Sequence, residues 1–268
     1  MTAKPADPET LLQIDDVKKT FGGVQAVSGC SFTLERGTIT GLIGPNGAGK
    51  TTLFNMIAGA FAPTSGSIRY RGEEIAGLPA HRLFHKGIVR TFQIPHEFGR
   101  MTCLENLMLV PPAQRGEGLL GNWLGWGRVV DEETRIREQA LEVLDFLQMS
   151  HLAGTLASRV SGGQKKLLEI GRTMMTDATL VLLDEPGAGV NRTLLADVVH
   201  AIRRLNAERG YTFCIIEHDM DLIAELCNPV VVMAQGRVLT QGTMEEVRSN
   251  DAVLEAYLGG GAAVEGDA

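Results

Sequence analysis

Short runs of β-branched and other apolar residues recur along the chain, separated by glycine turns and by stretches with helical spacing. Runs of this length between turn residues are typical of buried strands. They predict strands at Leu11–Val17, Val24–Leu34, Thr38–Ile43, Ser67–Tyr70, Thr179–Leu183, Thr212–Ile216 and Val230–Met233. Because strands alternate with helices in the last part of the chain, we expect a parallel sheet covered on both faces, and hence an α/β fold.

Three stretches carry the helical pattern. Thr52–Ala58 is rich in good helix formers, and Thr193–Glu208 lies between two predicted strands. In Asp131–Leu147 an apolar face repeats at helical spacing, and Asp131 is the expected N-cap. That face consists of Ile136, Ala140, Val143, Leu144 and Leu147.

Gly44–Thr51 reads Gly-Pro-Asn-Gly-Ala-Gly-Lys-Thr and stands between a predicted strand and a predicted helix. It fits the pattern G-x-x-x-x-G-K-[ST] of phosphate-binding loops, although a plain glycine turn before a helix is the alternative. Glycines let the backbone wrap around an anion, and the helix N-terminus adds partial positive charge. We expect Lys50 to reach the β- and γ-phosphates and Thr51 to bind Mg²⁺. The expected nucleotide contacts are Gly44, Pro45, Asn46, Gly47, Ala48, Gly49, Lys50, Thr51 and Thr52.

Leu180–Glu185 is a buried strand that ends in two carboxylates. Open α/β sheets place their ligands at this end of the strands. Asp184 is suited to hold Mg²⁺, and Glu185 is suited to orient and deprotonate an attacking water. The alternative is a capping pair at a strand end.

Val160–Gln164 reads Val-Ser-Gly-Gly-Gln and precedes a fourth stretch with helical spacing, which runs to Met174. Serine and two glycines at a helix start form an anion-binding site, or simply a helix cap. Two phosphate-binding elements far apart in one chain fit a nucleotide held between two subunits. The expected contacts of this second element are Ser161, Gly162, Gly163 and Gln164.

These motifs, in this order, resemble the ATPase subunits of ATP-binding cassette transporters. Gly44–Thr51 resembles their Walker A motif, Val160–Gln164 their signature and Leu180–Glu185 their Walker B motif. The resemblance implies a P-loop NTPase (RecA-like) core with an antiparallel β subdomain and an α-helical subdomain. It implies one domain over residues 8–258, with the core and β subdomain at about 8–92 and 165–258, the helical subdomain at about 93–164, and a disordered tail at 259–268.

Three single residues extend the resemblance. Phe21 is similar to the aromatic residue that stacks on adenine, although it could be an ordinary core residue. Gln93 resembles the glutamine that ligates Mg²⁺ or water and reports site occupancy, although it could be a solvated loop residue. His218 resembles the histidine that contacts the γ-phosphate, although a surface ion pair with Glu217 or Asp219 is the plainer interpretation.

The resemblance thus implies an ATPase that uses ATP and Mg²⁺ and works as one half of a clamp. The signature of a partner subunit closes over the γ-phosphate and excludes bulk water. The implied catalytic residues are Lys50, Glu185 and His218, and the implied Mg²⁺ contacts are Thr51, Gln93 and Asp184.

Within that family, several segments are similar to the ATPases of branched-chain amino-acid importers. They are Arg90–Gln93, Glu105–Leu107, Ala188–Asn191, Ile216–Met220 and Ala256–Gly259. Asn191 stands where other members often have aspartate, which puts in doubt any cross-subunit contact that needs the carboxylate. The implied partners are integral-membrane permease subunits, an identical chain or a LivF-like ATPase, and indirectly a periplasmic substrate-binding protein. The implied location is cytoplasmic, peripheral on the inner face of the membrane.

Composition narrows the function classes further. The 268 residues include 32 acidic and 25 basic ones, for a net charge of −7, without a dense Lys/Arg stripe. This balance argues against nucleic acid as a partner, because phosphate neutralisation dominates such binding. No apolar run approaches the roughly 20 residues that cross a bilayer, and no secretory signal is apparent. Four scattered cysteines without a C-x-x-C pair favour a reducing compartment.

Rival functions remain open at this point. One is a soluble, non-transport cassette ATPase, as in iron–sulfur assembly or DNA repair, although the DNA-repair relatives need a long coiled-coil insertion, which the chain lacks. The lipopolysaccharide-export ATPases share Ala-Gly-Val and a terminal Tyr-Leu-Gly, but generally lack the long insertion and Arg90–Gln93. A GTPase needs an Asn-Lys-x-Asp guanine reader, and no such tetrapeptide occurs.

Pro111–Arg128 is rich in Gly and Leu and carries both tryptophans, Trp123 and Trp126. A packed surface loop and a contact with permease or lipid are both compatible with it, since tryptophan favours wet–dry boundaries. If the segment tunes docking, replacing both tryptophans with alanine weakens the stimulation of ATPase activity by permease and spares basal activity. Intact transport by the double variant in proteoliposomes would contradict the hypothesis.

Overall fold

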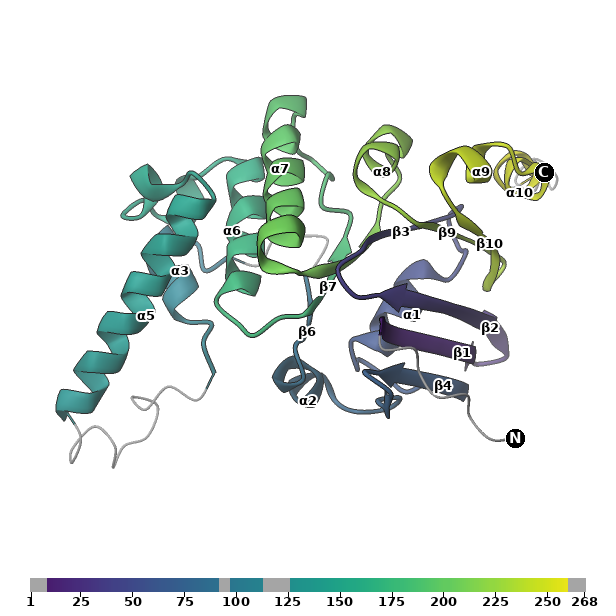
Figure 1. The fold of residues 1–268 in the computed structure, drawn as a ribbon, viewed down its shortest axis with the longest axis horizontal. Coiled ribbons are helices and arrows are strands. Elements are labelled where there is room, and N and C mark those ends of the chain that lie inside the picture. Colours follow the sequence, from purple (N-terminus) through teal and green to yellow (C-terminus); the bar gives the residue numbers. More distant parts are fainter. Residues whose placement is uncertain (1–8, 92–96, 113–125, 260–268) are drawn as a thin grey trace. The chain divides into compact units, whose positions relative to one another are not determined.

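The computed structural model describes residues 9–91, 97–112 and 126–259. Within them the chain forms two compact units (Figure 1). The first, the core unit, comprises Met1–Arg90, Thr179–Pro186 and Leu205–Ala268. The second, the helical unit, comprises Thr91–Ala178 and Gly187–Arg204. Gln93, Trp123 and the residues after 259 lie outside the described part, and so do the predictions made for them.

The core unit is built on a six-stranded sheet of order β10-β9-β3-β8-β7-β6. Its strands β9, β3, β8, β7 and β6 are parallel, and β10 pairs antiparallel with β9. All residues of β3, β7, β8 and β9 are buried, as expected of a sheet covered on both faces. The predicted α/β class is therefore confirmed. The strand bounds are β3 Ile39–Ile43, β6 Ile88–Arg90, β7 Leu180–Asp184, β8 Thr212–Ile216, β9 Val230–Ala234 and β10 Arg237–Gly242.

A second, antiparallel sheet of the core unit has the order β2-β1-β4-β5. Its first two strands form a hairpin in which Phe21 faces Val24 across Gly22 and Gly23. Both glycines have positive φ, as a two-residue hairpin turn of matching twist requires. This sheet is the antiparallel β subdomain that the family resemblance implied. Its bounds are β1 Thr10–Phe21, β2 Val24–Glu35, β4 Ser65–Tyr70 and β5 Glu73–Glu74.

One apolar cluster joins the two sheets of the core unit to helix α1, Lys50–Ile57. Leu53 and Phe54 of α1 are fully buried in it, with Leu12 and Ile68 from the antiparallel sheet and Met233 from β9. The loop that precedes α1 is thus held between a buried strand and a buried helix. The other helices of this unit are α2 Ala80–His85, α8 Met220–Leu226, α9 Met244–Arg248 and α10 Asp251–Gly259.

The helical unit contains α3 Cys103–Met108, α5 Trp126–Phe146, α6 Gly162–Met174 and the part of α7 (Arg192–Arg209) up to Arg204. The predicted apolar face of α5 is buried. The N-cap prediction for Asp131 is wrong, since α5 begins at Trp126 and Asp131 lies inside it. No proline interrupts residues 126–131, so the chain is able to form helix before Asp131.

Tight packing unites the helices of this unit. A Cβ at Gly171 of α6 would lie 2.8 Å from Leu147 and 3.1 Å from Val143, so glycine allows close approach of the chain segment at the end of α5. Because α6 packs on α3 and α5, the contacts group 165–178 with the helical unit. The subdomain boundaries implied by the resemblance stay a prediction. Among the described residues, the helices are too short or too polar to span a bilayer.

All four cysteines are free and buried, and burial raises the pKa of each thiol, to about 12 for Cys30 and Cys227. The thiolate is the reactive form, so a raised pKa keeps these groups protonated and inert at pH 8. We expect native protein to react with 5,5′-dithiobis(2-nitrobenzoate) at pH 8 only as fast as it unfolds, and denatured protein to release four equivalents of thionitrobenzoate at once. Rapid reaction of one thiol in the native state would contradict this.

Candidate active site

The loop between β3 and α1 has the backbone of an anion cradle. Gly44, Gly47 and Gly49 have positive φ values, of 147°, 79° and 95°. A Cβ at Gly44 would lie 2.0 Å from the Met233 carbonyl oxygen, and one at Gly49 would lie 2.5 Å from that of Ala26. Only glycine satisfies both the backbone conformation and the lack of space at these two positions.

Lys50 is the first residue of α1, and its side chain folds back over this loop. Its ammonium donates to the carbonyl oxygens of Gly44, at 2.6 Å, and Pro45, at 3.1 Å. Burial lowers the pKa of Lys50, whereas the charges of Glu185 and Asp184 raise it. The lysine therefore lies in the field of both carboxylates predicted from the sequence.

The two carboxylates lie at the C-terminal end of β7, which pairs with β8, which in turn pairs with β3. The carboxyl ends of these three parallel strands lie together at one edge of the sheet. Asp184 is the buried last residue of β7. Glu185 follows it in a left-handed conformation, with φ of 50°, and its N–H donates to the Ile216 carbonyl oxygen at 2.9 Å. A non-glycine residue in that region signals a constrained position.

His218 follows β8 at the same edge. Its Nε2 lies 3.2 Å from Oε1 of Glu185, 33 residues away in sequence. The sequence alternative was an ion pair of His218 with a neighbour. In the structure Glu217 instead accepts from the His218 backbone N–H, and Asp219 caps α8. The histidine ring is thus directed to the predicted water-orienting carboxylate.

Phe21 lies at the end of β1 and is 46 % exposed, so the core-residue alternative does not describe it. Its ring makes an edge contact with Phe61, with centroids 5.3 Å apart. Lys19 Nζ lies 5.0 Å from the Phe21 centroid and 4.8 Å from that of Phe61. An exposed aromatic ring of this kind can stack on a planar base.

Arg90, the last residue of β6, also belongs to this site, although the sequence predicted no separate role for it. Its guanidinium donates to Asp184 Oδ2 at 2.7 Å and to Asn55 Oδ1 at 2.6 Å. The available signal was a charged residue at the end of a short apolar run, Ile88–Val89. A single sequence could not show which carboxylate it meets, because Asp184 is 94 residues away.

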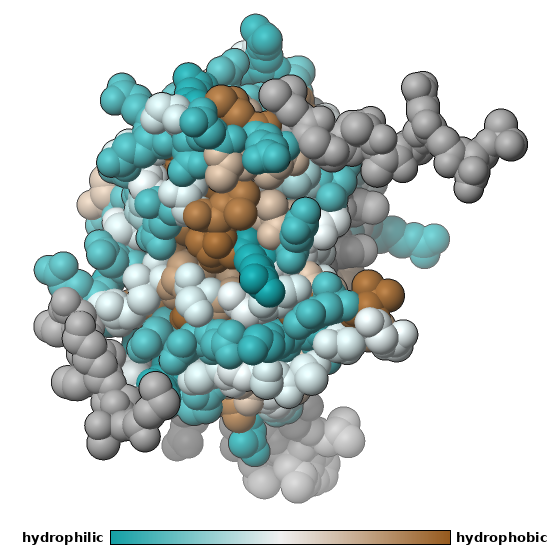
Figure 2. Space-filling model, turned by 90° about the vertical axis from the view of Figure 1, so that its right-hand side faces the viewer, coloured by the Kyte–Doolittle hydropathy of each residue, from teal (hydrophilic) through white to brown (hydrophobic). Residues whose placement is uncertain are grey.

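A groove of the core unit runs beside the phosphate loop, between residues 45–48, the turn after β9, and helix α10. Figure 2 shows the molecule from the side on which α9, α10 and the antiparallel strands end, with an apolar area among hydrophilic residues. Tyr257 lies on α10, the helix that supplies Ala252, Glu255 and Ala256 to this groove. Burial raises its pKa, and a hydrogen bond from the backbone of Gly44 opposes that shift.

The second predicted phosphate element lies in the helical unit, at the start of α6. Ser161 Oγ accepts from the Gln164 N–H, and the Gln164 side chain accepts from the Ser161 N–H at 2.9 Å. This capping box is the structural alternative considered above. A Cβ at Gly163 would lie 2.4 Å from the Leu194 side chain, so the second glycine of the motif permits close packing against α7.

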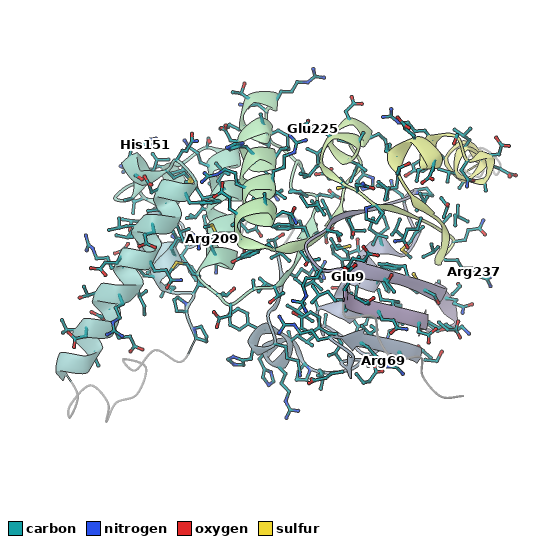
Figure 3. The ribbon with its side chains drawn as sticks, viewed as in Figure 1. Glu9, Arg69, His151, Arg209, Glu225 and Arg237 are labelled. Atoms are coloured by element: carbon teal, nitrogen blue, oxygen red, sulfur yellow. The ribbon has the colours of Figure 1, made fainter. Side chains whose placement is uncertain are left out.

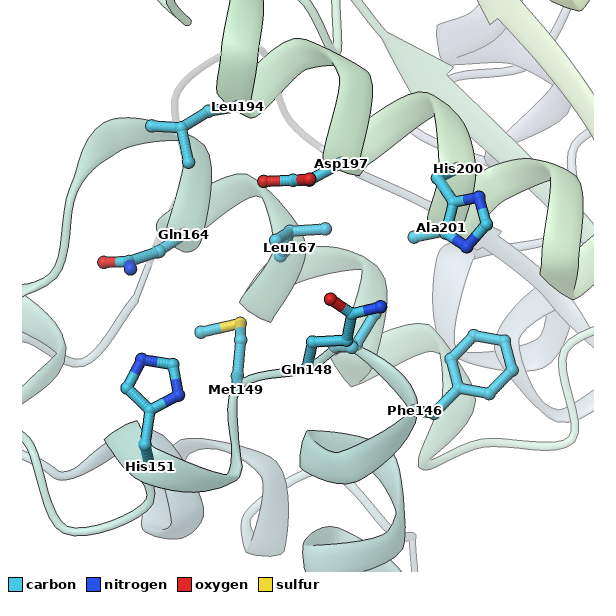
Figure 4. A pocket seen from close by; sticks show the side chains of 11 residues that line it. Phe146, Gln148, Met149, His151, Gln164, Leu167, Leu194, Asp197, His200 and Ala201 are labelled. Carbon is cyan, nitrogen blue, oxygen red and sulfur yellow. The ribbon is translucent and has the colours of Figure 1, made fainter.

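Gln164 also lines a pocket of the helical unit, shown in Figure 4. Its wall combines apolar side chains of α5, α6, α7 and the segment after α5 with polar ones, namely Gln148, His151, Gln164, Asp197 and His200. Asn191 precedes α7, and its Oδ1 accepts from the Leu194 N–H at 2.9 Å. The asparagine that departs from the common family residue therefore caps this helix.

Fold and site together define a P-loop nucleotide hydrolase with a separate helical unit. The family model of ABC transporters matches residues 27–188, and that of branched-chain amino acid ATP-binding cassette transporters matches residues 237–263. The chain belongs to the ABC transporter family and is an ATP-binding ATPase subunit. Subunits of this kind bind adenine nucleotides and work with membrane permease subunits.

Curated relatives are similar over almost the whole chain. A probable branched-chain amino acid transport ATP-binding protein LivG of Archaeoglobus fulgidus is 40 % identical, over 93 % of this chain and 95 % of that protein. The high-affinity branched-chain amino acid transport ATP-binding protein BraF of Pseudomonas aeruginosa is 39 % identical, over 93 % and 98 %. LivG of Escherichia coli K12 is 36 % identical, over 94 % and 98 %.

Solved structures give the same result. A nucleotide-free ATP-binding cassette from an ABC transporter matches with a TM-score of 0.80 and 37 % identity, over 92 % of this chain and 98 % of that one. An ATP-binding cassette in its ADP conformation matches with a TM-score of 0.79 and 35 % identity, over 93 % and 99 %.

The cradle geometry makes a specific prediction for Gly44→Ala. The Cβ of the alanine would collide with the Met233 carbonyl, so the loop must shift. We expect nucleotide affinity to fall about tenfold or more, which corresponds to a loss of binding free energy of roughly 1.4 kcal/mol. Titration with a fluorescent ATP analogue measures it. Gly37→Ala is the matched control, because Gly37 also has positive φ, of 73°, but open space around its Cβ. Equal affinities of the two variants would show that the collision does not matter.

Proposed function

We propose that this chain is the ATP-hydrolysing subunit that powers import of branched-chain or related amino acids through a membrane permease. The observation that carries the proposal is the convergence of Lys50, Asp184, Glu185 and His218 around one sheet edge, in a chain of this family. The substrate class rests on relatives from three organisms that are named for branched-chain amino acid transport.

In this proposal the glycine-rich loop binds the phosphates through its backbone N–H groups, and Phe21 packs against adenine. Lys50 exchanges its contacts with the Gly44 and Pro45 carbonyl oxygens for the β- and γ-phosphates. Glu185 orients the attacking water and accepts its proton, and His218 supports the γ-phosphate from its position beside Glu185. These are the catalytic residues of the proposal.

Mg²⁺ belongs to the same proposal, and the oxygen donors present fit it. The Asp184 carboxylate and the Thr51 hydroxyl are hard ligands, and Thr51 is the second residue of α1, directly after Lys50. Mg²⁺ is usually held by one or two protein oxygens together with substrate phosphates and water, so a dedicated cage of acidic residues is not needed. Bound Mg²⁺ would neutralise phosphate charge during transfer. Gln93, assigned to the same ion, lies outside the described residues.

The partner subunit is proposed to supply a signature element like Ser161–Gln164, so that two chains close on each nucleotide. The partner is an identical chain or a LivF-like ATPase, and a periplasmic binding protein would deliver the amino acid to the permease. This arrangement puts the chain on the cytoplasmic face of the membrane. The lipopolysaccharide-export alternative is less well supported, because the curated relatives reported above are named for amino-acid transport.

Glu185→Gln tests the catalytic assignment. The amide keeps the size of the side chain but cannot accept a proton, so we expect ATP to bind normally while turnover falls about 100-fold or more, the usual scale of general-base loss. We also expect this variant to accumulate as an ATP-bound dimer in size-exclusion chromatography.

The matched control is Glu225→Gln, on α8 of the same unit (Figure 3), where activity should stay at the wild-type level. Wild-type turnover of Glu185→Gln would remove Glu185 from its role. Uptake of radiolabelled leucine by proteoliposomes with the cognate permease tests the substrate class separately, and failure to transport any branched-chain amino acid would contradict it.

A further inference from the structure

We propose that Arg90 is a positioning residue for the magnesium site, which aims the Asp184 carboxylate by holding one of its two oxygens. The inference rests on the proposed role of Asp184 and adds a residue to it. Arg90 and Asp184 both belong to the core unit, and they lie on neighbouring strands, where Arg90 of β6 pairs with Leu182 of β7.

The contact is short and shielded from water. Arg90 donates to Asp184 Oδ2 at 2.7 Å, and the two side chains are 12 % and 7 % exposed. The other terminal nitrogen of Arg90 donates to Asn55 Oδ1 of α1 at 2.6 Å. The guanidinium is thereby fixed at two points, and the carboxylate cannot rotate without breaking a charge-assisted hydrogen bond.

The two oxygens of the Asp184 carboxylate have different roles in this geometry. Because the ion pair uses Oδ2, the other oxygen, Oδ1, is the one left for a metal ion. Partners of a ligand that fix its orientation in this way commonly decide how well the site binds its metal. A lysine could supply the charge but not the two-pronged contact to Asp184 and Asn55.

The remaining nitrogen of the Arg90 guanidinium shows that this position is energetically unfavourable for part of the side chain. Its Nε is buried, and the described residues offer it no hydrogen-bond acceptor. An unsatisfied buried donor is unfavourable, so the side chain holds a position determined by its terminal nitrogens. Arg90 is also the last residue of the core unit before the segment that contains Gln93. The side chain that positions Asp184 therefore lies at the end of β6, and the segment with Gln93 begins at the same point.

The test measures the binding of Mn²⁺, a probe for Mg²⁺, to full-length protein saturated with the non-hydrolysable analogue AMP-PNP. Electron paramagnetic resonance detects free Mn²⁺ and so gives the midpoint, which is the Mn²⁺ concentration at half saturation. We expect Arg90→Gln to raise it about 10-fold or more, the scale found when a partner of a metal ligand is removed. Arg90→Lys should raise it less, and Asn55→Ala should shift it in the same direction. The Mg²⁺ concentration for half-maximal ATPase activity should rise in the same variants as the Mn²⁺ midpoint does.

Arg69→Gln is the matched control, since Arg69 of β4 (Figure 3) pairs with Glu74 at 3.7 Å and has no part in the site. Its midpoint should equal that of wild type. Thermal unfolding checks each variant, and Asn55→Ala carries the test alone if Arg90→Gln does not fold. Unchanged or lower midpoints in the Arg90 and Asn55 variants, beside a raised one in Asp184→Asn, overturn the role of Arg90 only. An unchanged midpoint in Asp184→Asn overturns the metal role of Asp184 and, with it, that of Arg90.

Discussion

The parallel hydrogen-bond ladder that joins β3, β8 and β7 is the constraint on which the site depends. Each of these strands is buried along its whole length, so its register cannot slip without exposing an apolar face or breaking the ladder. The phosphate loop, the carboxylate pair and the segment with His218 lie at the C-terminal ends of these three strands. Backbone pairing therefore brings together functional residues from three distant parts of the sequence.

The side chains then refine what the ladder brings together. Glu185 adopts a left-handed backbone conformation beside the end of β8, and His218 reaches it at 3.2 Å. Lys50 lies near both carboxylates, and Arg90 neutralises Asp184 from the other side. A buried carboxylate is unfavourable without such partners. Arg90 provides such a partner for Asp184, and His218 lies beside Glu185.

In the helical unit, local contacts and not strand pairing hold the predicted nucleotide-binding residues. Its signature element is locally complete, because Ser161 and Gln164 satisfy each other in a capping box and Gly163 packs on Leu194. Asn191 caps α7 in the same way. Each helix start is thus stable within one chain. In the proposed dimer, the N–H groups at the start of α6 bind a nucleotide held by a partner. The same residues can satisfy the fold and the function because a helix N-terminus favours an anion.

The sequence by itself determined the α/β class, the phosphate loop and the two carboxylates, because these are local patterns: a buried strand, glycines of unusual backbone conformation, and charges at a strand end. It misplaced the start of α5, where no local signal marks Trp126 rather than Asp131. Only the tertiary structure decided that His218 meets Glu185 and that Arg90 meets Asp184 and Asn55. Strand order determines such contacts over tens of residues, and spacing along one chain does not encode it.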